Sequence, residues 1–489
     1  MHRLSNLDAS FLHLESARTP MHIGCVLTFS APASGEMTFQ RFKDFIASRL
    51  PISPIFRRKL SSQIFDIDRP AWIEDENFNI DEHIFDQELD LSREQHQKNE
   101  LISDFFSSTL DQSRPLWEML FIKNSEQKTK SIEDKPNTKG EFYALLKFHH
   151  AAVDGMSAEK ILSGLMSPEK TSLETLKDAW KPKPSYFSKT AMEVTGKHVQ
   201  NAYRAPNKLL ALIRRTGHSA LSSQALRFID KQQLPPHFFM APDTPFNREI
   251  DKEHDFASAH LSLHKIKEVR KAYPGSTIND VVLAVCAGAL RKGLDQQGEL
   301  PEQALVAMIP VSKRRKDESN PKKENGNLIS PMLVSLATDI DDSVSRLGMI
   351  HQNTLVAKKF NKKVAVERIM KHLPSWSSAL TIKAFTHLRL GKYINPVFNT
   401  IITNVPGPKE PLYLDGAELL SMEGIAPIVD GMGLTMVVTS YIDTLTISLT
   451  TSASMSEQTH HLVNHFEGAL EDLHHKLVIN NNITPLAAA

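Results

Sequence analysis

The N-terminal segment "LSNLDASFLHLE" carries apolar side chains at helical spacing, at Leu4, Leu7, Phe11 and Leu14. This pattern predicts a helix, which Pro20 ends before the strand-like segment "HIGCVLTFSAP". Two further strands are expected in "RPLWEMLFIK" (114–123) and "EFYALLKFHH" (141–150). The polar tract 124–140 between them has no apolar periodicity, so we expect it to form a long exposed hairpin loop.

A second α+β pattern begins at residue 247. The segment "HDFASAHLSLHKIKEVRKAY" predicts a strand followed by a helix, and "TINDVVLAVCAGALRKGLDQ" predicts a buried helix capped by Thr277 or Asn279. The run "ALVAMIPVSKR" is typical of a buried strand. Farther on, "MVVTSYIDTLTISLTTS" alternates like a hairpin that turns near Asp443 and Thr444, and "HHLVNHFEGALEDLHHKLV" predicts an amphipathic closing helix.

The segment 179–246 separates the two patterns. It combines a Pro/Lys break with a helical pattern rich in basic residues, namely Lys197, Arg204, Lys208, Arg214, Arg215 and Arg227. We interpret it as a basic helical crossover linker between an N-terminal domain (1–178) and a C-terminal domain (247–489). The basic face is either an ordinary solvated surface or a contact for anionic lipid or a phosphorylated cofactor.

Composition narrows the class of protein. A chain of 489 residues exceeds one ordinary hydrophobic core, so two domains are expected. Lys+Arg and Asp+Glu balance at 57 each, which indicates no nucleic-acid partner. Cys25 and Cys286, the two cysteines, lie in apolar runs and are too few for a disulfide framework, which fits a reducing cytoplasm. We see no signal-peptide pattern or membrane-spanning apolar run, so a soluble or peripheral protein is expected.

The stretch "FHHAAVDGMSAEK" (148–160) carries the candidate chemistry. Strand alternation in 142–150 places His149 and His150 on opposite faces, which makes joint metal chelation difficult, and no nearby cysteine or carboxylate cluster supplies further ligands. We therefore expect no metal site. His150 stands at the strand end, before a turn and a helix over 156–165, where an imidazole can remove a hydroxyl proton near neutral pH.

Asp154 and Gly155 complete this motif. Asp154 can brace the turn by hydrogen bonds or an ion pair, and Gly155 permits a crowded or left-handed conformation. The alternative is a packed strand-end histidine with a turn aspartate, and the residues by themselves leave both open. A covalent serine mechanism is unsupported, because the chain has no G-x-S-x-G elbow.

The segment "HHAAVDG" matches the HHxxxDG motif of the CoA-dependent acyltransferase superfamily. Further matches occur in order along nearly the whole chain: "LDASFLHLESARTPMHIG" (7–24), "SRPLWE" (113–118), "TINDVVLA" (277–284), "IPVSKR" (309–314), "GNLISPMLVSLATDI" (326–340) and "TNVPGP" (403–408). Together they resemble the bacterial wax ester synthase/diacylglycerol acyltransferase family.

The resemblance implies an α/β fold with two chloramphenicol-acetyltransferase-like domains, joined by a helical linker, and an active site in a tunnel at their interface. It implies transfer of a long-chain acyl group from acyl-CoA to a fatty alcohol or diacylglycerol, with no bound cofactor and no acyl-enzyme. His150 would be the general base, His149 would support the site, Asp154 would be structural and Gly155 would keep the turn close.

The remaining site residues are less specific. Pro115, Leu116 and Trp117, with Asn279 and Asp280, match segments held in the family to shape the acyl tunnel and the domain contact. Lys313, Arg314 and Arg315 are candidates for binding the CoA phosphates, against an ordinary solvated charge cluster. Asn279, Thr439 and Ser440 are candidate oxyanion donors.

An apolar product implies that the enzyme works at a membrane or lipid-body surface. We expect a cytoplasmic protein associated peripherally with the inner membrane or lipid inclusions, with the basic linker as the candidate contact. Two alternatives stay open: an acyltransferase of the same fold that takes its donor from a carrier protein, and a non-catalytic lipid-body protein.

Overall fold

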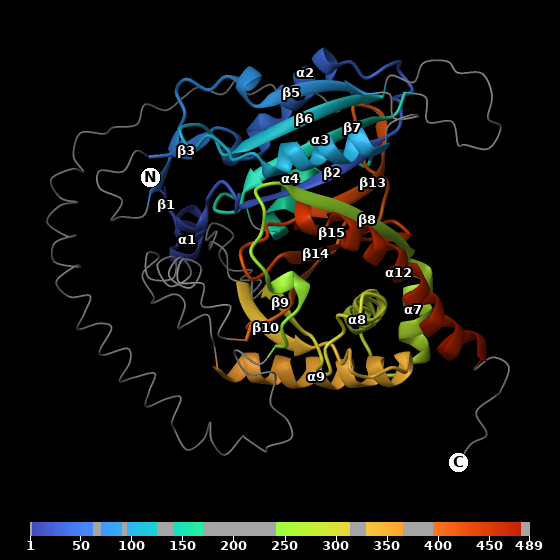
Figure 1. Cartoon of the computed structure of the whole chain (residues 1–489). Coiled ribbons are helices and arrows are strands. Elements are labelled where there is room, and N and C mark those ends of the chain that lie inside the picture. Colours follow the sequence, from blue (N-terminus) through green and yellow to red (C-terminus); the bar gives the residue numbers. More distant parts are fainter. Residues whose placement is uncertain are drawn as a thin grey trace, which may run out of the picture.

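A computed structural model of the chain describes residues 2–61, 70–89, 95–124, 140–153, 155–169, 241–312, 329–364 and 395–480. Within these ranges the fold is mixed α/β, with two six-stranded sheets in two sheet-containing domains (Figure 1). The α/β class expected from the sequence is confirmed.

The N-terminal sheet has the strand order β12-β13-β2-β7-β6-β5. Its strands are β12 (Tyr413–Leu414), β13 (Ala417–Ile425), β2 (His22–Phe29), β7 (Phe142–His149), β6 (Trp117–Asn124) and β5 (Ile84–Leu89). Neighbours are antiparallel except β5 and β6, which run parallel. A small sheet of β1 (His2–Arg3), β4 (Ala71–Glu74) and β3 (Arg58–Leu60) accompanies it.

The C-terminal sheet has the order β10-β9-β11-β14-β15-β8. Its strands are β10 (Ile329–Ser335), β9 (Val306–Ser312), β11 (Thr400–Val405), β14 (Leu434–Tyr441), β15 (Thr444–Ser452) and β8 (His254–Ser262). β11 runs parallel to both of its neighbours, and the other pairs are antiparallel. The predicted hairpin is β14–β15, with Tyr441 paired to Thr444 across its turn.

Helices cover the faces of both sheets. They are α1 (Asn6–Leu14), α2 (Phe39–Arg49), α3 (Gln95–Ser107), α4 (Gly155–Leu165), α7 (Leu263–Ala272), α8 (Ile278–Gln296), α9 (Ser343–Val364) and α12 (Ser456–His474). In the N-terminal domain α2 and α4 pack on one face of the sheet, and α3 packs on the other. Alternation along β7 is confirmed, since Phe142, Ala144, Leu146 and Phe148 enter the first of these cores and Leu145 the second.

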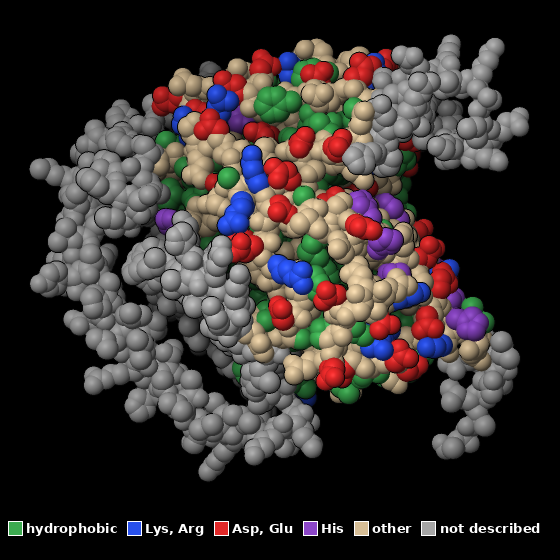
Figure 2. Space-filling view, in the orientation of Figure 1, with side chains coloured by type: hydrophobic (Ala, Val, Ile, Leu, Met, Phe, Trp, Pro, Cys, Tyr) green, Lys and Arg blue, Asp and Glu red, His purple; other side chains and the backbone are tan. Residues whose placement is uncertain are grey.

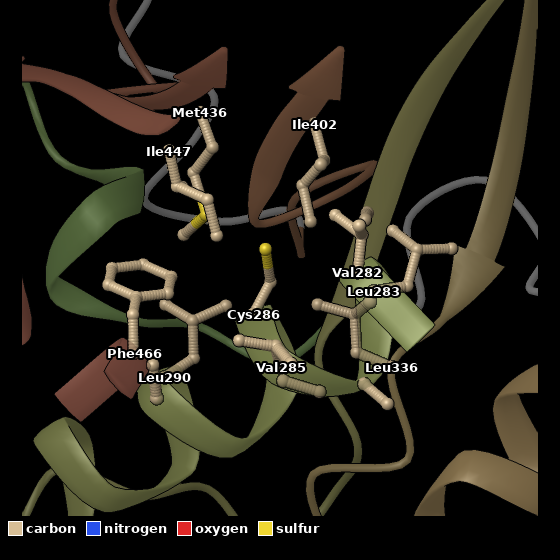
Figure 3. Close-up of a cluster of buried hydrophobic side chains, with 14 of the residues drawn as sticks. Val282, Leu283, Val285, Cys286, Leu290, Leu336, Ile402, Met436, Ile447 and Phe466 are labelled. Carbon is tan, nitrogen blue, oxygen red and sulfur yellow. The ribbon is translucent and has the colours of Figure 1, made fainter. Parts of the chain in front are cut away.

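α8 is the central helix of the C-terminal domain. Every residue from Asp280 to Leu290 is buried, as expected for a helix that is apolar on all sides. Figure 3 shows Cys286 of α8 among Met436, Ile447 and other apolar side chains from the sheet and from neighbouring helices. Thr277 is the N-cap, and its hydroxyl accepts the Asp280 N–H, which decides between the two caps that the sequence allowed.

Strand β13 joins the two halves of the chain. It lies between 400 and 430 in the sequence but pairs with β2 of the N-terminal sheet, with Met422 opposite Leu27 and Ile425 opposite Gly24 (Figure 1). The Thr439 hydroxyl of β14 donates to the Met422 carbonyl at 2.9 Å, so this strand also contacts the C-terminal sheet. The linker 179–246 lies mostly outside the described residues, and the domain boundaries at 178 and 246 stay a prediction.

The surface shows no segregation of charge on the face drawn in Figure 2, where acidic and basic side chains are intermingled. Among the described helices, none is long and apolar enough to cross a membrane.

Candidate active site

The backbone at the end of β7 is held from both sides. The His149 N–H donates to the Leu116 carbonyl at 3.1 Å, just before β6. The His150 N–H donates to the Met21 carbonyl at 2.7 Å, just before β2. These two hydrogen bonds fix the point at which the chain turns after His149. The backbone of the histidine pair is therefore held by the segments that precede β6 and β2.

His150 follows the last residue of the strand and is half-buried. Its ring stacks on Phe11 of α1, with the ring centroids 4.2 Å apart and the planes inclined by 18°. The predicted position of this imidazole at a strand end is confirmed, and the stacking partner adds a constraint on ring orientation that the sequence did not reveal. The following helix α4 begins at Gly155.

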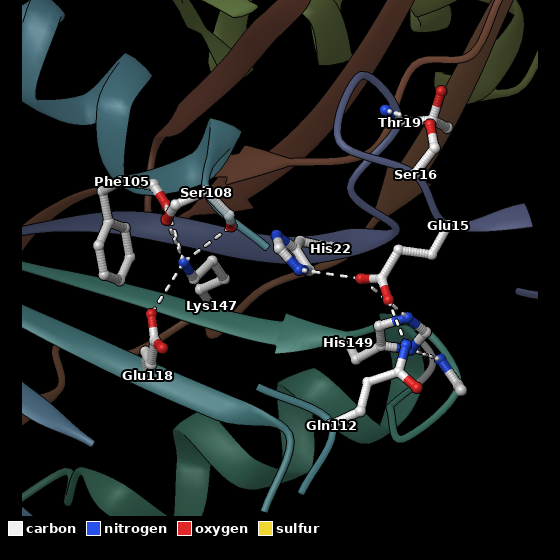
Figure 4. Close-up of polar contacts among 11 residues, drawn as sticks. Glu15, Ser16, Thr19, His22, Phe105, Ser108, Gln112, Glu118, Lys147 and His149 are labelled. Carbon is white, nitrogen blue, oxygen red and sulfur yellow. Dashed lines mark hydrogen bonds and ion pairs between the residues drawn. The ribbon is translucent and has the colours of Figure 1, made fainter. Parts of the chain in front are cut away.

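His149 is fully buried, and its ring lies beside Glu15 (Figure 4). Its Nδ1 accepts the Ala151 N–H at 3.0 Å. Burial, and secondarily the neighbouring His150, lower the pKa of His149 to about 3. The ring is therefore neutral at physiological pH.

Glu15 stands between two histidines. Its Oε1 lies 3.5 Å from His149 Nε2 and 3.7 Å from His22 Nε2, while Gln112 donates to its other carboxylate oxygen. Burial raises the pKa of Glu15, which the Gln112 hydrogen bond and the positive charge of Lys147 partly oppose. Glu15 was not identified from the sequence; the available signal is its position four residues after Phe11, at the C-cap of α1.

Lys147 points to the same side of β7 as His149 and is fully buried. Its ammonium group donates to the carbonyls of Phe105 and Ser108, at 2.8 and 3.1 Å, and pairs with Glu118 at 2.9 Å (Figure 4). These contacts satisfy the end of α3 and fix it against β7. Burial lowers the pKa of Lys147, against the opposing effect of Glu118.

Trp117 of the predicted "PLW" segment is a core side chain. Its indole N–H donates to the Phe56 carbonyl at 3.0 Å, and its ring stacks on His83 with centroids 4.5 Å apart. Pro115 and Leu116 are buried as well. The structure thus brings this segment to the histidine pair through the Leu116 carbonyl, and its role in an acyl tunnel stays a prediction.

Asp280 connects helices within the C-terminal domain. Its carboxylate accepts hydrogen bonds from His351 Nδ1 at 3.0 Å and from the Thr354 hydroxyl at 2.7 Å, both on α9. Burial raises the pKa of Asp280, but the hydrogen bonds from His351, Thr277 and Thr354 outweigh it and hold the pKa below its ordinary value. Asn279 beside it is half-buried, and the predicted tunnel role of the pair stays a prediction.

The two hydroxyl candidates for an oxyanion donor differ. Thr439 donates its only hydroxyl proton to the Met422 carbonyl. The Ser440 hydroxyl oxygen instead accepts the Gly407 N–H at 3.2 Å, so its own proton can be donated to an oxyanion. Asp154, Lys313, Arg314 and Arg315 lie outside the described residues, so their roles stay predictions.

Comparison with known proteins identifies the family. The catalytic-domain model of the wax ester synthase/diacylglycerol acyltransferase family matches residues 4–282, and the model of its C-terminal domain matches residues 325–474. A probable diacylglycerol O-acyltransferase of Mycobacterium tuberculosis is 30% identical over 473 residues, which cover 95% of this chain and 97% of that protein. The O-acyltransferase WSD of Acinetobacter baylyi is 29% identical over 96% of each chain.

Solved structures agree. The wax ester synthase/diacylglycerol acyltransferase of Marinobacter aquaeolei superposes with a TM-score of 0.67 and 26% identity, over 97% of this chain and 99% of that one. The first condensation domain of the CDA synthetase shares the fold, with a TM-score of 0.55 and 14% identity, over 97% and 96% of the two chains. The chain therefore belongs to the wax ester synthase/diacylglycerol acyltransferase family and is an acyltransferase.

Proposed function

We propose that this enzyme transfers a long-chain fatty acyl group from acyl-CoA to the hydroxyl group of a fatty alcohol or a diacylglycerol, forming a wax ester or a triacylglycerol. The observation that carries the proposal is the placement of His150, whose backbone is bonded to Met21 and whose ring is stacked on Phe11 at the end of β7. The names of the relatives, which include diacylglycerol O-acyltransferase and wax ester synthase, support the two acceptor classes.

His150 acts as the general base. Its ring nitrogen takes the proton of the acceptor hydroxyl while the hydroxyl oxygen attacks the thioester carbonyl carbon. The tetrahedral intermediate then collapses, the carbon–sulfur bond breaks, and the departing CoA sulfur receives the proton held by His150. A neutral His149 next to His150 favours this cycle, because a second positive charge beside the transient imidazolium would oppose its formation.

No acyl-enzyme is needed. A thioester is already activated, so a positioned base, an oxyanion donor and exclusion of water suffice for direct transfer. For the oxyanion we propose Asn279 or the Ser440 hydroxyl, which keeps its proton, in preference to the Thr439 hydroxyl, which is engaged with Met422. Lys313, Arg314 and Arg315 are proposed to bind the CoA phosphates.

The acceptors and products are apolar, so we propose that the enzyme works at a membrane or lipid-inclusion surface, with the basic linker 179–246 as the contact. Vesicles containing anionic lipid should then bind the protein in low salt and release it in high salt. Binding that does not respond to salt would remove the linker from the proposal.

The deciding experiment is release of free CoA from palmitoyl-CoA by the purified protein. It is run with hexadecanol, with dipalmitoylglycerol and with no acceptor, for the wild type, His150→Ala and His264→Ala. His264 is a matched control because its side chain is 74% exposed on α7. Acceptor-dependent release that is lost only in His150→Ala is the expected result.

Other outcomes have definite meanings. No release with any acceptor favours a carrier-bound donor or a non-catalytic role at a lipid surface. Release that is unchanged in His150→Ala overturns the general-base assignment. Incorporation of labelled palmitate into the protein itself, after a chase without acceptor, would contradict direct transfer.

A further inference from the structure

Three buried polar atoms converge beside the histidine pair. Within the described part of the chain, Glu15 Oε1, His22 Nε2 and His149 Nε2 have no hydrogen-bond partner of normal distance and angle. They belong to Glu15, the C-cap residue that follows α1, and to the directly paired positions His22 and His149 of β2 and β7 (Figure 4). A buried polar atom left without a partner costs on the order of 1–3 kcal/mol, so a group of three calls for a specific arrangement of protons.

The tautomer of His149 follows from its other nitrogen. Nδ1 accepts the Ala151 N–H, so Nδ1 carries a lone pair and no proton. The neutral ring therefore carries its proton on Nε2. Glu15 Oε1 can accept this proton and lies 3.5 Å from Nε2.

We propose that Glu15 is a positioning residue that accepts the Nε2 proton of His149 and thereby fixes the tautomer that binds Ala151. A contraction of about 0.5 Å brings the two atoms to normal hydrogen-bond distance. Ala151 immediately follows His150 in the chain. Glu15 would orient the His149 ring, and that ring binds the Ala151 amide, so Glu15 would hold the turn that carries the base. This inference rests on the proposed role of His150 for its catalytic consequence, but not for its structural content.

The placement of Glu15 supports a dedicated role. The C-terminal end of α1 puts Phe11 against the His150 ring, and the C-cap residue Glu15, whose N–H donates to the Phe11 carbonyl, lies against His149. Gln112 holds the second carboxylate oxygen, which orients the first toward the histidines. The low pKa of His149, about 3, keeps the ring in the neutral form that the arrangement requires.

The first test reads the tautomer directly. Protein labelled with ¹⁵N at histidine is examined by long-range ¹H–¹⁵N correlation between pH 6 and 8, and the His149 signals are assigned by their loss in His149→Gln. The expected wild-type spectrum shows a protonated Nε2 and an unprotonated Nδ1 throughout. A His149 ring protonated at Nδ1 overturns the proposal, whatever the activity of the enzyme.

The second test compares Glu15→Gln with Glu15→Leu. The amide oxygen of Gln can still accept the Nε2 proton, so the tautomer should persist and kcat should stay within about threefold of wild type. Leu has no acceptor, so we expect mixed tautomers, faster hydrogen exchange at the Ala151 amide and kcat about 10-fold to 100-fold lower, with KM for palmitoyl-CoA little changed. Melting curves accompany each variant, and the exposed Glu36→Leu is the control for loss of an acid.

The outcomes separate this inference from the proposed function. An unaltered tautomer in Glu15→Leu, or equal losses in the Gln and Leu variants, overturns the role of Glu15. If Glu15→Leu does not fold, the wild-type and Glu15→Gln spectra still test the inference, because a His149 ring protonated at Nδ1 in either protein contradicts it. If His150→Ala is fully active, the proposed base is wrong, yet the His149 spectra continue to test Glu15.

Discussion

The rings of Phe11 and His150 stack with their centroids 4.2 Å apart, although the two residues are far apart in the sequence. Helix α1 thus reaches across to the end of β7 and restricts the orientation of the imidazole proposed to act as base. Phe11 was expected from its spacing only to be an apolar helix position, whereas the structure places it in the candidate active site.

Replacing Phe11 with Leu should lower activity. An aromatic pair is stabilised by roughly 0.5–1.5 kcal/mol beyond apolar burial, so loosening the His150 ring should reduce kcat about 2-fold to 10-fold. Steady-state CoA release measures this effect. Phe39→Leu is the control, because the Phe39 ring packs against Phe121 in the core between α2 and the N-terminal sheet, away from His150. Equal activity of Phe11→Leu and wild type would show that stacking does not position the base.

Acid should destabilise the protein through its buried neutral histidines. Burial lowers the pKa values of His22, His83, His149 and His254. For His149 the folded pKa is about 3 and the ordinary value 6.5, so the unfolded chain binds more protons between these pH values. Its stabilising contribution is full above pH 6.5 and is lost as the pH falls toward 3, by up to about 1.4 kcal/mol per pH unit.

Urea unfolding between pH 5 and 8 measures this loss. His149→Gln should show a shallower decline in the free energy of unfolding than wild type, and the exposed His264→Gln should follow wild type. Glu15 partly offsets the trend, because its raised pKa makes acidification favour the folded state. Identical pH slopes for wild type and His149→Gln would contradict a neutral buried His149.

Gly24→Ala should be destabilising. A Cβ at Gly24 would lie 2.2 Å from the Leu146 carbonyl oxygen and 2.5 Å from the Phe106 ring, so β2 and β7 would have to separate beside the histidine pair. We expect a loss of about 1–3 kcal/mol in the free energy of unfolding, with reduced activity. Gly468→Ala in α12 is the matched control: no atom lies within 4 Å of its Cβ, and helix propensity predicts a gain of about 0.5–1 kcal/mol. The same melting temperature for both variants would contradict the close approach.

Asp280→Asn should lower the free energy of unfolding. The substitution removes the charge that His351 and Thr354 contact, at a cost of roughly 1.5–3 kcal/mol, while KM for palmitoyl-CoA should be unchanged. Asp295→Asn, at an exposed position of the same helix, is the control. An unchanged unfolding curve together with a raised KM would instead favour a substrate-binding role for this segment.

Combined substitution of Lys313, Arg314 and Arg315 by Gln should raise KM for palmitoyl-CoA about 10-fold to 100-fold, because three phosphate contacts of roughly 0.5–1 kcal/mol each would be lost. The effect should shrink as salt is added. A second triple variant at the exposed Arg270, Lys358 and Lys359 controls for net charge. Equal KM values in the two triple variants would count against phosphate binding.

Local pattern was sufficient to predict most elements. The first helix, the strands around 117–124 and 142–149, the α8 helix, and the closing hairpin and helix are all present, and the α8 cap is Thr277, one of the two residues expected. Each depends on side chains a few residues apart, whose periodicity of burial can be read from the chain itself. The strand-like run 141–150 likewise placed His150 at a strand end, and the structure has it directly after β7.

Long-range partners were not predictable in this way. Nothing local indicates that β13 pairs with β2, that Glu15 reaches His149, or that Asp280 binds His351, since each joins residues far apart in sequence. Strand register and buried polar contacts depend on which surfaces meet, and that is settled by packing of the whole domain. The sequence by itself determined the elements, the family resemblance and the histidine proposed as base, whereas tertiary structure decided which helix orients that histidine and which carboxylate faces its neighbour.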